Sequence, residues 1–170
     1  MTLDINRFKA KFLGGARPNR FQVLVNFPSY AGGDSEKTSF MVRAAGIPGV
    51  AMGELPIAFR GRQAPYPGDT TFEPWTITVL NDTDFGVHDA MVAWKNGINN
   101  NETNSADADI SEWFTDIIVE QLGRTEGEVL KRFKLISAYP ESIGAITLDN
   151  EADGYETFEV TFKYLSWTAV

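Results

Sequence analysis

The sequence predicts a mainly β fold: an antiparallel β-sandwich or barrel with one flanking α-helix. Segments whose apolar residues alternate recur along most of the chain and amount to about eight strands. One further segment has apolar residues at helical spacing and the length of an ordinary helix. Because 170 residues suit one domain and no internal repeat is visible, we expect a single domain over residues 1–170.

Residues 1–15 predict a short arm or helix with one apolar stripe, which Gly14-Gly15 ends. Its apolar stripe consists of Ile5, Phe8 and Phe12. Alternation from Arg20 to Phe27 then predicts a half-buried strand. Alternation resumes from Thr38 to Ala44, and we expect these two strands to form a hairpin-like pair.

Residues 44–69 alternate but are cut by four prolines, at positions 48, 56, 65 and 67. Proline cannot donate to a strand ladder, so these strands should lie at an edge or project from the sheet. Exposed apolar strands are costly for a monomer. The segment therefore either folds back on its own core or, as a projection over residues 46–68, contacts a partner.

The middle of the chain predicts a strand from Thr71 to Leu80 and a helix from Asp84 to Ile98. The helix buries one stripe and has three candidate N-terminal caps, Asp82, Thr83 and Asp84. The stripe consists of Val87, Met91, Trp94 and Ile98. Residues 99–109 lack apolar periodicity and predict an exposed loop.

The run Trp113–Leu122 fits both a helix and a strand, and its β-branched residues before the turn-like GRTEG favour a strand. We expect it to form a hairpin with Val129–Ala138. A short strand at Ala145–Leu148 and a final strand at Thr157–Trp167 complete the expected order.

Charge is unevenly distributed along the chain, whose formal net charge is -8. Residues 1–62 carry nine Lys and Arg against four acids, a net +5, and residues 63–170 carry six against nineteen, a net -13. This balance argues against a surface built to hold nucleic acid. Either folding mixes the two halves in space, or the basic surface of one subunit meets the acidic surface of an identical neighbour, head to tail.

Groups suited to catalysis or metal binding are few. The chain has no cysteine and one histidine, His88, for which we expect a surface or packing role. The acidic run 149–154 begins like a calcium loop, but Val160 stands where the bidentate Glu belongs, so a hairpin turn is expected instead. Phosphate-binding glycine motifs and membrane-spanning apolar runs are absent from the sequence. We therefore expect no enzyme activity, cofactor, metal or membrane contact.

Several segments, in order, resemble the tail tube protein of contractile-tailed bacteriophages, the major subunit of the inner tail tube. They are ARPNRFQV (16–23), AAGIPG (44–49), GDTTFEPWTITVLND (68–82), the Val92-Ala-Trp94 end of the helix, YPESIG (139–144) and ETFEVTFKYLSW (156–167). They cover nearly the full length, and the pattern G-D-x-T-F-x-x-W-T-[IV]-T-V-x-N-D is long enough to be specific.

The resemblance implies a subunit of six-membered rings whose sheets join into one continuous barrel, with the rings stacked head to tail. It implies several partners: the tail sheath protein, baseplate tube proteins, a tape-measure protein, and genomic DNA that passes through without specific binding. It also implies a virion component assembled in the bacterial host cytoplasm. An acidic lumen would let DNA slide, because like charges repel phosphate.

The arm and the projecting segment are the least self-sufficient parts of the chain, so we expect them to carry contacts between rings. The candidate residues are Ile5, Phe8, Phe12, Ile47, Pro48, Val50, Met52, Leu55, Ile57, Phe59, Arg60 and Arg62. One alternative function is a baseplate tube component or the tube of a phage-like injection or secretion device. A β-barrel hydrolase or carbohydrate-binding module is the alternative from another class.

Overall fold

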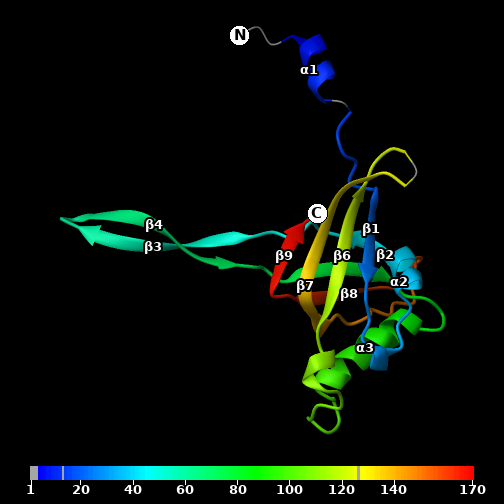
Figure 1. Ribbon diagram of the computed structural model, residues 1–170. Coiled ribbons are helices and arrows are strands. Elements are labelled where there is room, and N and C mark those ends of the chain that lie inside the picture. The colour runs from blue at the N-terminus through cyan, green and yellow to red at the C-terminus, as the bar shows by residue number, and fades with distance from the viewer. Residues whose placement is uncertain (1–3, 13, 126) are drawn as a thin grey trace.

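The computed structural model describes residues 4–12, 14–125 and 127–170, and the chain is mainly β (Figure 1). Within these residues seven strands form one antiparallel sheet in the order β1-β6-β7-β8-β5-β2, with β9 also paired to β7. The main strands are β1 (Phe21–Val25), β2 (Val42–Ala45), β5 (Trp75–Leu80), β6 (Thr115–Leu122), β7 (Val129–Ile143), β8 (Thr157–Lys163) and β9 (Ser166–Ala169). A separate hairpin consists of β3 (Ala51–Phe59) and β4 (Arg62–Thr71).

Strand β7 bends the sheet into two layers. Its first part pairs with β6 and β9, and its last part, from Tyr139, pairs with β8. Ser137, at the junction, has a φ of 54°, a conformation that turns the strand away from ideal extension. Strands β1 and β2 stand at the two ends of the strand order and do not pair with each other in the described residues, so the sheet is not closed into a barrel within one chain.

Apolar side chains fill the space between the layers, because alternate residues of each strand point inward. Val23, Ile77, Leu135 and Val160 are all inaccessible to solvent. Helix α3 (Gly86–Ile98) flanks the sandwich and places Trp94 in this core, against Phe162 and Phe27. The ring nitrogen of Trp94 donates to the carbonyl of Trp113, 2.9 Å away, which ties the helix to the segment before β6.

The expected strand from Thr38 to Ala44 is wrong over its first part. Residues Ser35–Met41 form helix α2, and only Val42–Ala45 are extended. The side chain of Asp34 accepts hydrogen bonds from the backbone N–H groups of Glu36 and Lys37 at 2.9 and 3.0 Å, and this cap starts the helix. The alternation of Phe40 and Val42 had predicted a strand instead. Phe40, which lies within the expected strand, is 77% exposed. Helix α2 is therefore an addition to the helix of the arm, α1 (Ile5–Phe12), and to the expected flanking helix α3.

The expected pairing of the first two strands is wrong as well. β1 pairs with β6 (Val23 opposite Val119), and β2 pairs with β5 (Ala45 opposite Ile77). Helix α2 intervenes between β1 and β2 along the chain, so a tight hairpin is impossible.

Three other boundaries differ from expectation. The strand expected from Thr71 to Leu80 is divided, because β4 ends at Thr71 and β5 begins after Pro74. Residues Ala145–Leu148 are not a strand. The last expected strand divides at Tyr164-Leu165, after which β9 joins the other layer. The expected β6–β7 hairpin is confirmed (Val119 opposite Phe133), although residue 126 of its turn lies outside the described residues.

Asp116 holds the bend of β7 in place. Its Oδ1 accepts the backbone N–H of Ser137 at 3.1 Å, and its Oδ2 lies 2.8 Å from Nζ of Lys134. The hydrogen bonds from Lys134 and from Ser137 outweigh partial burial and lower the pKa of the Asp116 carboxyl.

Replacing Asp116 with alanine should therefore destabilise the fold by about 1 kcal/mol at neutral pH. A pKa lowered in the folded state gives stability that is present above the unfolded value of about 3.9 and lost as pH falls through the folded value. The difference between Asp116→Ala and the parent chain should thus shrink on acidification below about pH 4. Urea unfolding at neutral and acidic pH measures this, and a difference independent of pH would contradict it.

Candidate assembly surfaces

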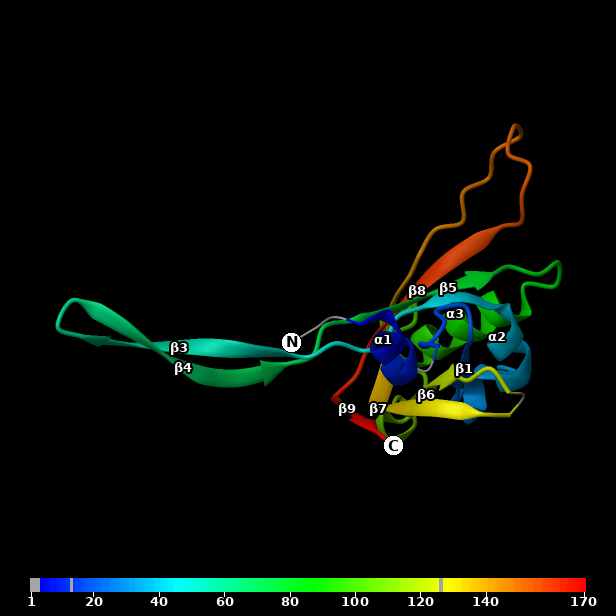
Figure 2. The same ribbon diagram turned by 90° about the horizontal axis from the view of Figure 1, so that it is seen from above.

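The hairpin β3–β4 extends away from the sheet as a two-stranded ribbon (Figures 1 and 2). Arg60 and Gly61 form its turn, with φ values of 47° and 80°, which suit a two-residue hairpin connection. Every residue of β3 is exposed, and so is every residue of β4 except the half-buried Gly68. The ribbon therefore does not fold back on the core of its own chain.

The pairing register divides the ribbon into two different faces. Opposed residues of an antiparallel pair project to the same side. One side carries Leu55 opposite Tyr66, Ile57 opposite Ala64 and Phe59 opposite Arg62. The other side carries Glu54 opposite Pro67, Pro56 opposite Pro65 and Ala58 opposite Gln63. We call the first side the apolar face: Leu55, Ile57, Phe59, Ala64 and Tyr66, whose four large side chains are each more than half exposed.

Prolines also shape the two edges of the ribbon. Pro56 and Pro65 lie opposite each other, and because neither has an N–H, they occupy a non-hydrogen-bonded pair whose backbone groups point outward. Pro65 and Pro67 are two residues apart on β4, so their backbone nitrogens face the same edge of the ribbon. Two successive outward N–H groups are therefore missing from that edge. A further strand cannot be added there by regular pairing. Side-chain packing on the apolar face is a means of contact that does not need this edge.

The root of the hairpin is anchored on the sheet. The ring nitrogen of Trp75 donates to the carbonyl of Gly46 at 2.6 Å, and that of Trp167 donates to the carbonyl of Gly49 at 3.1 Å. Pro48, between them, is buried in its own chain. The neighbouring candidates Ile47, Val50 and Met52 are exposed.

The N-terminal arm presents a second apolar surface. In α1 the candidate residues Ile5, Phe8 and Phe12 are 61%, 57% and 55% exposed, and the last two rings stack with centroids 5.1 Å apart. No residue of the helix is buried. Residues 1–3 and 13 of the expected arm lie outside the described residues. Figure 1 shows α1 standing off the sheet, and more than half of each side chain in its stripe is exposed.

Eleven of the twelve candidates are exposed on two separate surfaces, the hairpin with its root and the arm, and Pro48 is buried in its own chain. Arg60 and Arg62 lie at the exposed tip, with the Arg60 guanidinium 5.3 Å from the centroid of the Phe59 ring. Sequence reasoning missed Tyr66, which belongs to the apolar face. Its signal was available in hindsight, because a two-residue turn at Arg60-Gly61 sets Tyr66 opposite Leu55.

The residues considered for chemistry take structural positions. His88 packs edge-on against Phe158 with ring centroids 5.2 Å apart. In the acidic run, Asp149 Oδ1 accepts the backbone N–H of Glu151, which makes a local turn. Within the described ranges, no three His, Cys, Asp or Glu residues gather in a way that could hold a metal ion. None of the helices described there has the length and apolar character needed to span a membrane.

Comparisons with known proteins give a consistent result. A family model described as "Phage tail tube protein" matches residues 16–170. The tail tube protein of Serratia phage KSP90 is 31% identical over 166 residues, which is 94% of this chain and 93% of the relative. The tail tube protein gp19 of Enterobacteria phage T4 is 31% identical over 156 residues, covering 89% and 90%.

Solved structures support the fold. The tube-terminating cap of the anti-feeding prophage aligns with a TM-score of 0.69 at 17% identity, covering 92% of this chain and 91% of that one. The sheath-tube complex of an extracellular contractile injection system aligns with a TM-score of 0.60 at 16% identity, covering 99% of both chains. At these identities the likeness concerns the fold alone.

Proposed function

Since this chain belongs to the phage tail tube protein family, we propose that its copies form six-membered rings that stack head to tail into the tube of a contractile phage tail. Like its relatives, it is a structural protein and not an enzyme. Membership of this family overturns the hydrolase and carbohydrate-binding alternatives. Tail tube proteins are components of the virion.

The observation that supports this proposal most directly is the exposed apolar face of the hairpin. A long apolar ribbon in water is unfavourable for an isolated subunit, and burial against another copy removes that cost. The open sheet supports the same conclusion, because strands β1, β2 and β9 each have a ladder partner on one side only in the described residues. Neighbouring copies in a ring can complete these edges and close a continuous barrel.

The partners of the tube follow from this role. A sheath protein surrounds the tube, baseplate tube proteins start it, a tape-measure protein occupies its channel, and the genome passes through without specific binding. Assembly takes place in the host cytoplasm. The arm and the hairpin carry the contacts between rings, through the exposed candidates named above.

Electron microscopy of the purified protein, combined with light scattering, tests the proposal. We expect rings or hollow rods at high protein concentration. A strictly monomeric protein, with or without assembly factors from its own source, would overturn it. Quantitative protein staining of purified particles distinguishes the alternative, since a tube subunit is among the most abundant proteins and a baseplate component is scarce.

A further inference from the structure

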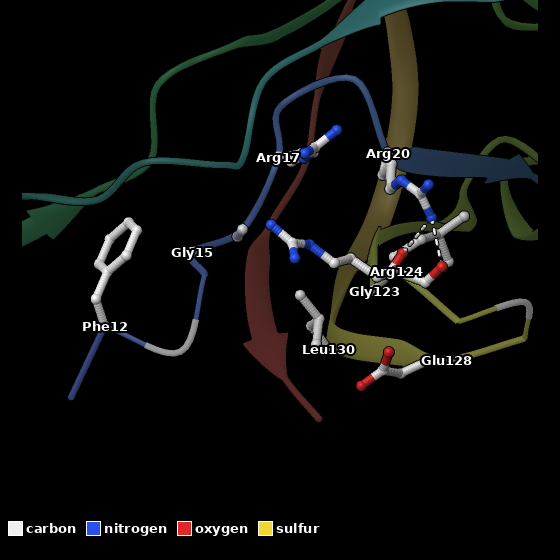
Figure 3. A pocket seen from close by; sticks show the side chains of 10 residues that line it. Phe12, Gly15, Arg17, Arg20, Gly123, Arg124, Glu128 and Leu130 are labelled. Atoms are coloured by element: carbon white, nitrogen blue, oxygen red, sulfur yellow. Dashed lines mark hydrogen bonds between the residues drawn. The ribbon is translucent and has the colours of Figure 1, made fainter. Parts of the chain in front are cut away.

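Three arginines gather at the base of the N-terminal arm. Arg17, Arg20 and Arg124 line a cavity of about 320 Å³ between the arm and the β6–β7 turn (Figure 3). Among the described residues none of the three lies within 4 Å of a carboxylate oxygen. Glu128 also lines the cavity, but its Oε2 accepts the backbone N–H of Thr125. This local excess of positive charge, in a chain of net charge -8, leaves the three guanidiniums open to an acidic partner.

The chain itself holds two of these arginines in position. Arg20 donates to the carbonyls of Gly123 and Arg124, both at 2.9 Å, and Arg124 donates to the carbonyl of Gly14 at 3.2 Å. Gly14 has a φ of 92°, and a Cβ there would lie 3.1 Å from the Arg124 guanidinium, so a glycine is required for this approach. Each guanidinium has five N–H donors, and these bonds leave donors free on both residues. The side chain of Arg17 makes no hydrogen bond within the described ranges.

The cavity also has an apolar wall. Phe12, Leu122 and Leu130 line it beside the arginines. An apolar centre with a charged rim is typical of a surface that receives a protein side chain, whereas a phosphate backbone has no apolar group to fill it.

The opposite end of β6 carries the complementary pattern. The turn η2 (Ile110–Glu112) comes just before the start of β6, and the arginine cavity lies beyond its end at Leu122. An eight-residue strand separates its two ends by roughly 23 Å. Asp109 and Glu112 are exposed and have no cationic partner within 4 Å in the described part of the chain. Between them Ile110 is 66% exposed. This end therefore has an apolar knob flanked by carboxylates.

We propose that the η2 turn of one copy docks into the arginine cavity of the next copy. Ile110 packs on the apolar wall, and Asp109 and Glu112 accept hydrogen bonds from the guanidiniums, a pairing that arginine geometry favours. Because the two surfaces lie at opposite ends of one subunit, the contact is heterologous and repeats in a line, as stacking requires. This inference rests on the proposed tube function and names one of its contacts.

A charge swap tests the inference. Arg17→Glu and Asp109→Lys should each raise the critical protein concentration for tube formation by roughly tenfold, because each places like charges across the contact. The double variant should return to within about threefold of the parent protein, since the pair is restored with reversed sign. The side chains of Arg17 and Asp109 make no hydrogen bonds within the described residues, so neither substitution should unfold the chain. Melting curves check that each variant remains folded.

Glu151→Lys provides the matched control. It changes the charge as Asp109→Lys does, but in the exposed loop after β7, and it should not rescue Arg17→Glu. Parent-like assembly of both single variants, or a double variant as defective as the singles, would overturn the inference. If the parent protein forms no tubes, the proposed function fails instead. Binding of labelled double-stranded DNA that Arg17→Glu abolishes, with assembly unchanged, would assign the cavity to phosphate and also overturn the inference.

Discussion

Replacement of Ala51–Thr71 by a short Gly-Ser linker should abolish tube assembly and leave the rest of the chain folded. Ala51 and Thr71 are paired across the hairpin, so their Cα atoms lie roughly 5 Å apart and a short linker can join the flanking residues. The carbonyls of Gly46 and Gly49 remain to anchor Trp75 and Trp167. The deletion removes only strands that pair with each other.

Point variants separate the apolar face from the ribbon as a whole. Leu55→Thr, Ile57→Thr and Phe59→Thr together should prevent assembly, because burying each large apolar side chain contributes about 1.5–3 kcal/mol. The matched control places the same number of threonines on the other face, as Glu54→Thr, Ala58→Thr and Gln63→Thr, and should still assemble. Negative-stain microscopy and sedimentation measure the outcome. Tubes of normal length from the deletion, or equal defects in the two triple variants, would refute the assignment of contacts to the apolar face.

Trp94→Ala should produce the largest loss of stability among core substitutions. The side chain is fully buried, packs against Phe27 and Phe162, and donates to the carbonyl of Trp113. Truncation leaves a cavity and an unsatisfied carbonyl, and we expect a loss of about 3–5 kcal/mol in the free energy of unfolding.

Trp94→Phe is the control for this prediction. It keeps most of the ring volume and loses the hydrogen bond to Trp113, so it should cost about 1–2 kcal/mol. Urea unfolding followed by circular dichroism measures both variants. A loss below about 1 kcal/mol for Trp94→Ala would show that α3 is not anchored in the core by this residue.

Local patterns in the sequence were sufficient for the elements whose side chains follow one clear period. Helix α3 has its buried stripe of Val87, Met91 and Trp94, and β8 buries Phe158, Val160 and Phe162 in strict alternation. Local patterns gave the wrong element at α2, where the cap from Asp34 starts a helix despite the alternation of Phe40 and Val42. They were also wrong at Ala145–Leu148, where the expected strand does not form.

The partners of strands were not available from local pattern. Periodicity states which face of a strand is apolar but not which strand lies beside it. The separation of β1 from β2, and the bend of β7 at Ser137 that lets one strand serve both layers, depend on contacts between residues far apart in the chain.

The linear sequence was enough to establish the family, the mainly β composition, the proline-interrupted hairpin segment and the uneven charge, because each is a property of neighbouring residues or of their order. Folding in three dimensions added the rest. It buried Pro48, placed Tyr66 beside Leu55 and gathered Arg17, Arg20 and Arg124 around one cavity. Such groupings arise from pairing between distant segments, and pairing free energy depends on the whole core and not on any local run of residues.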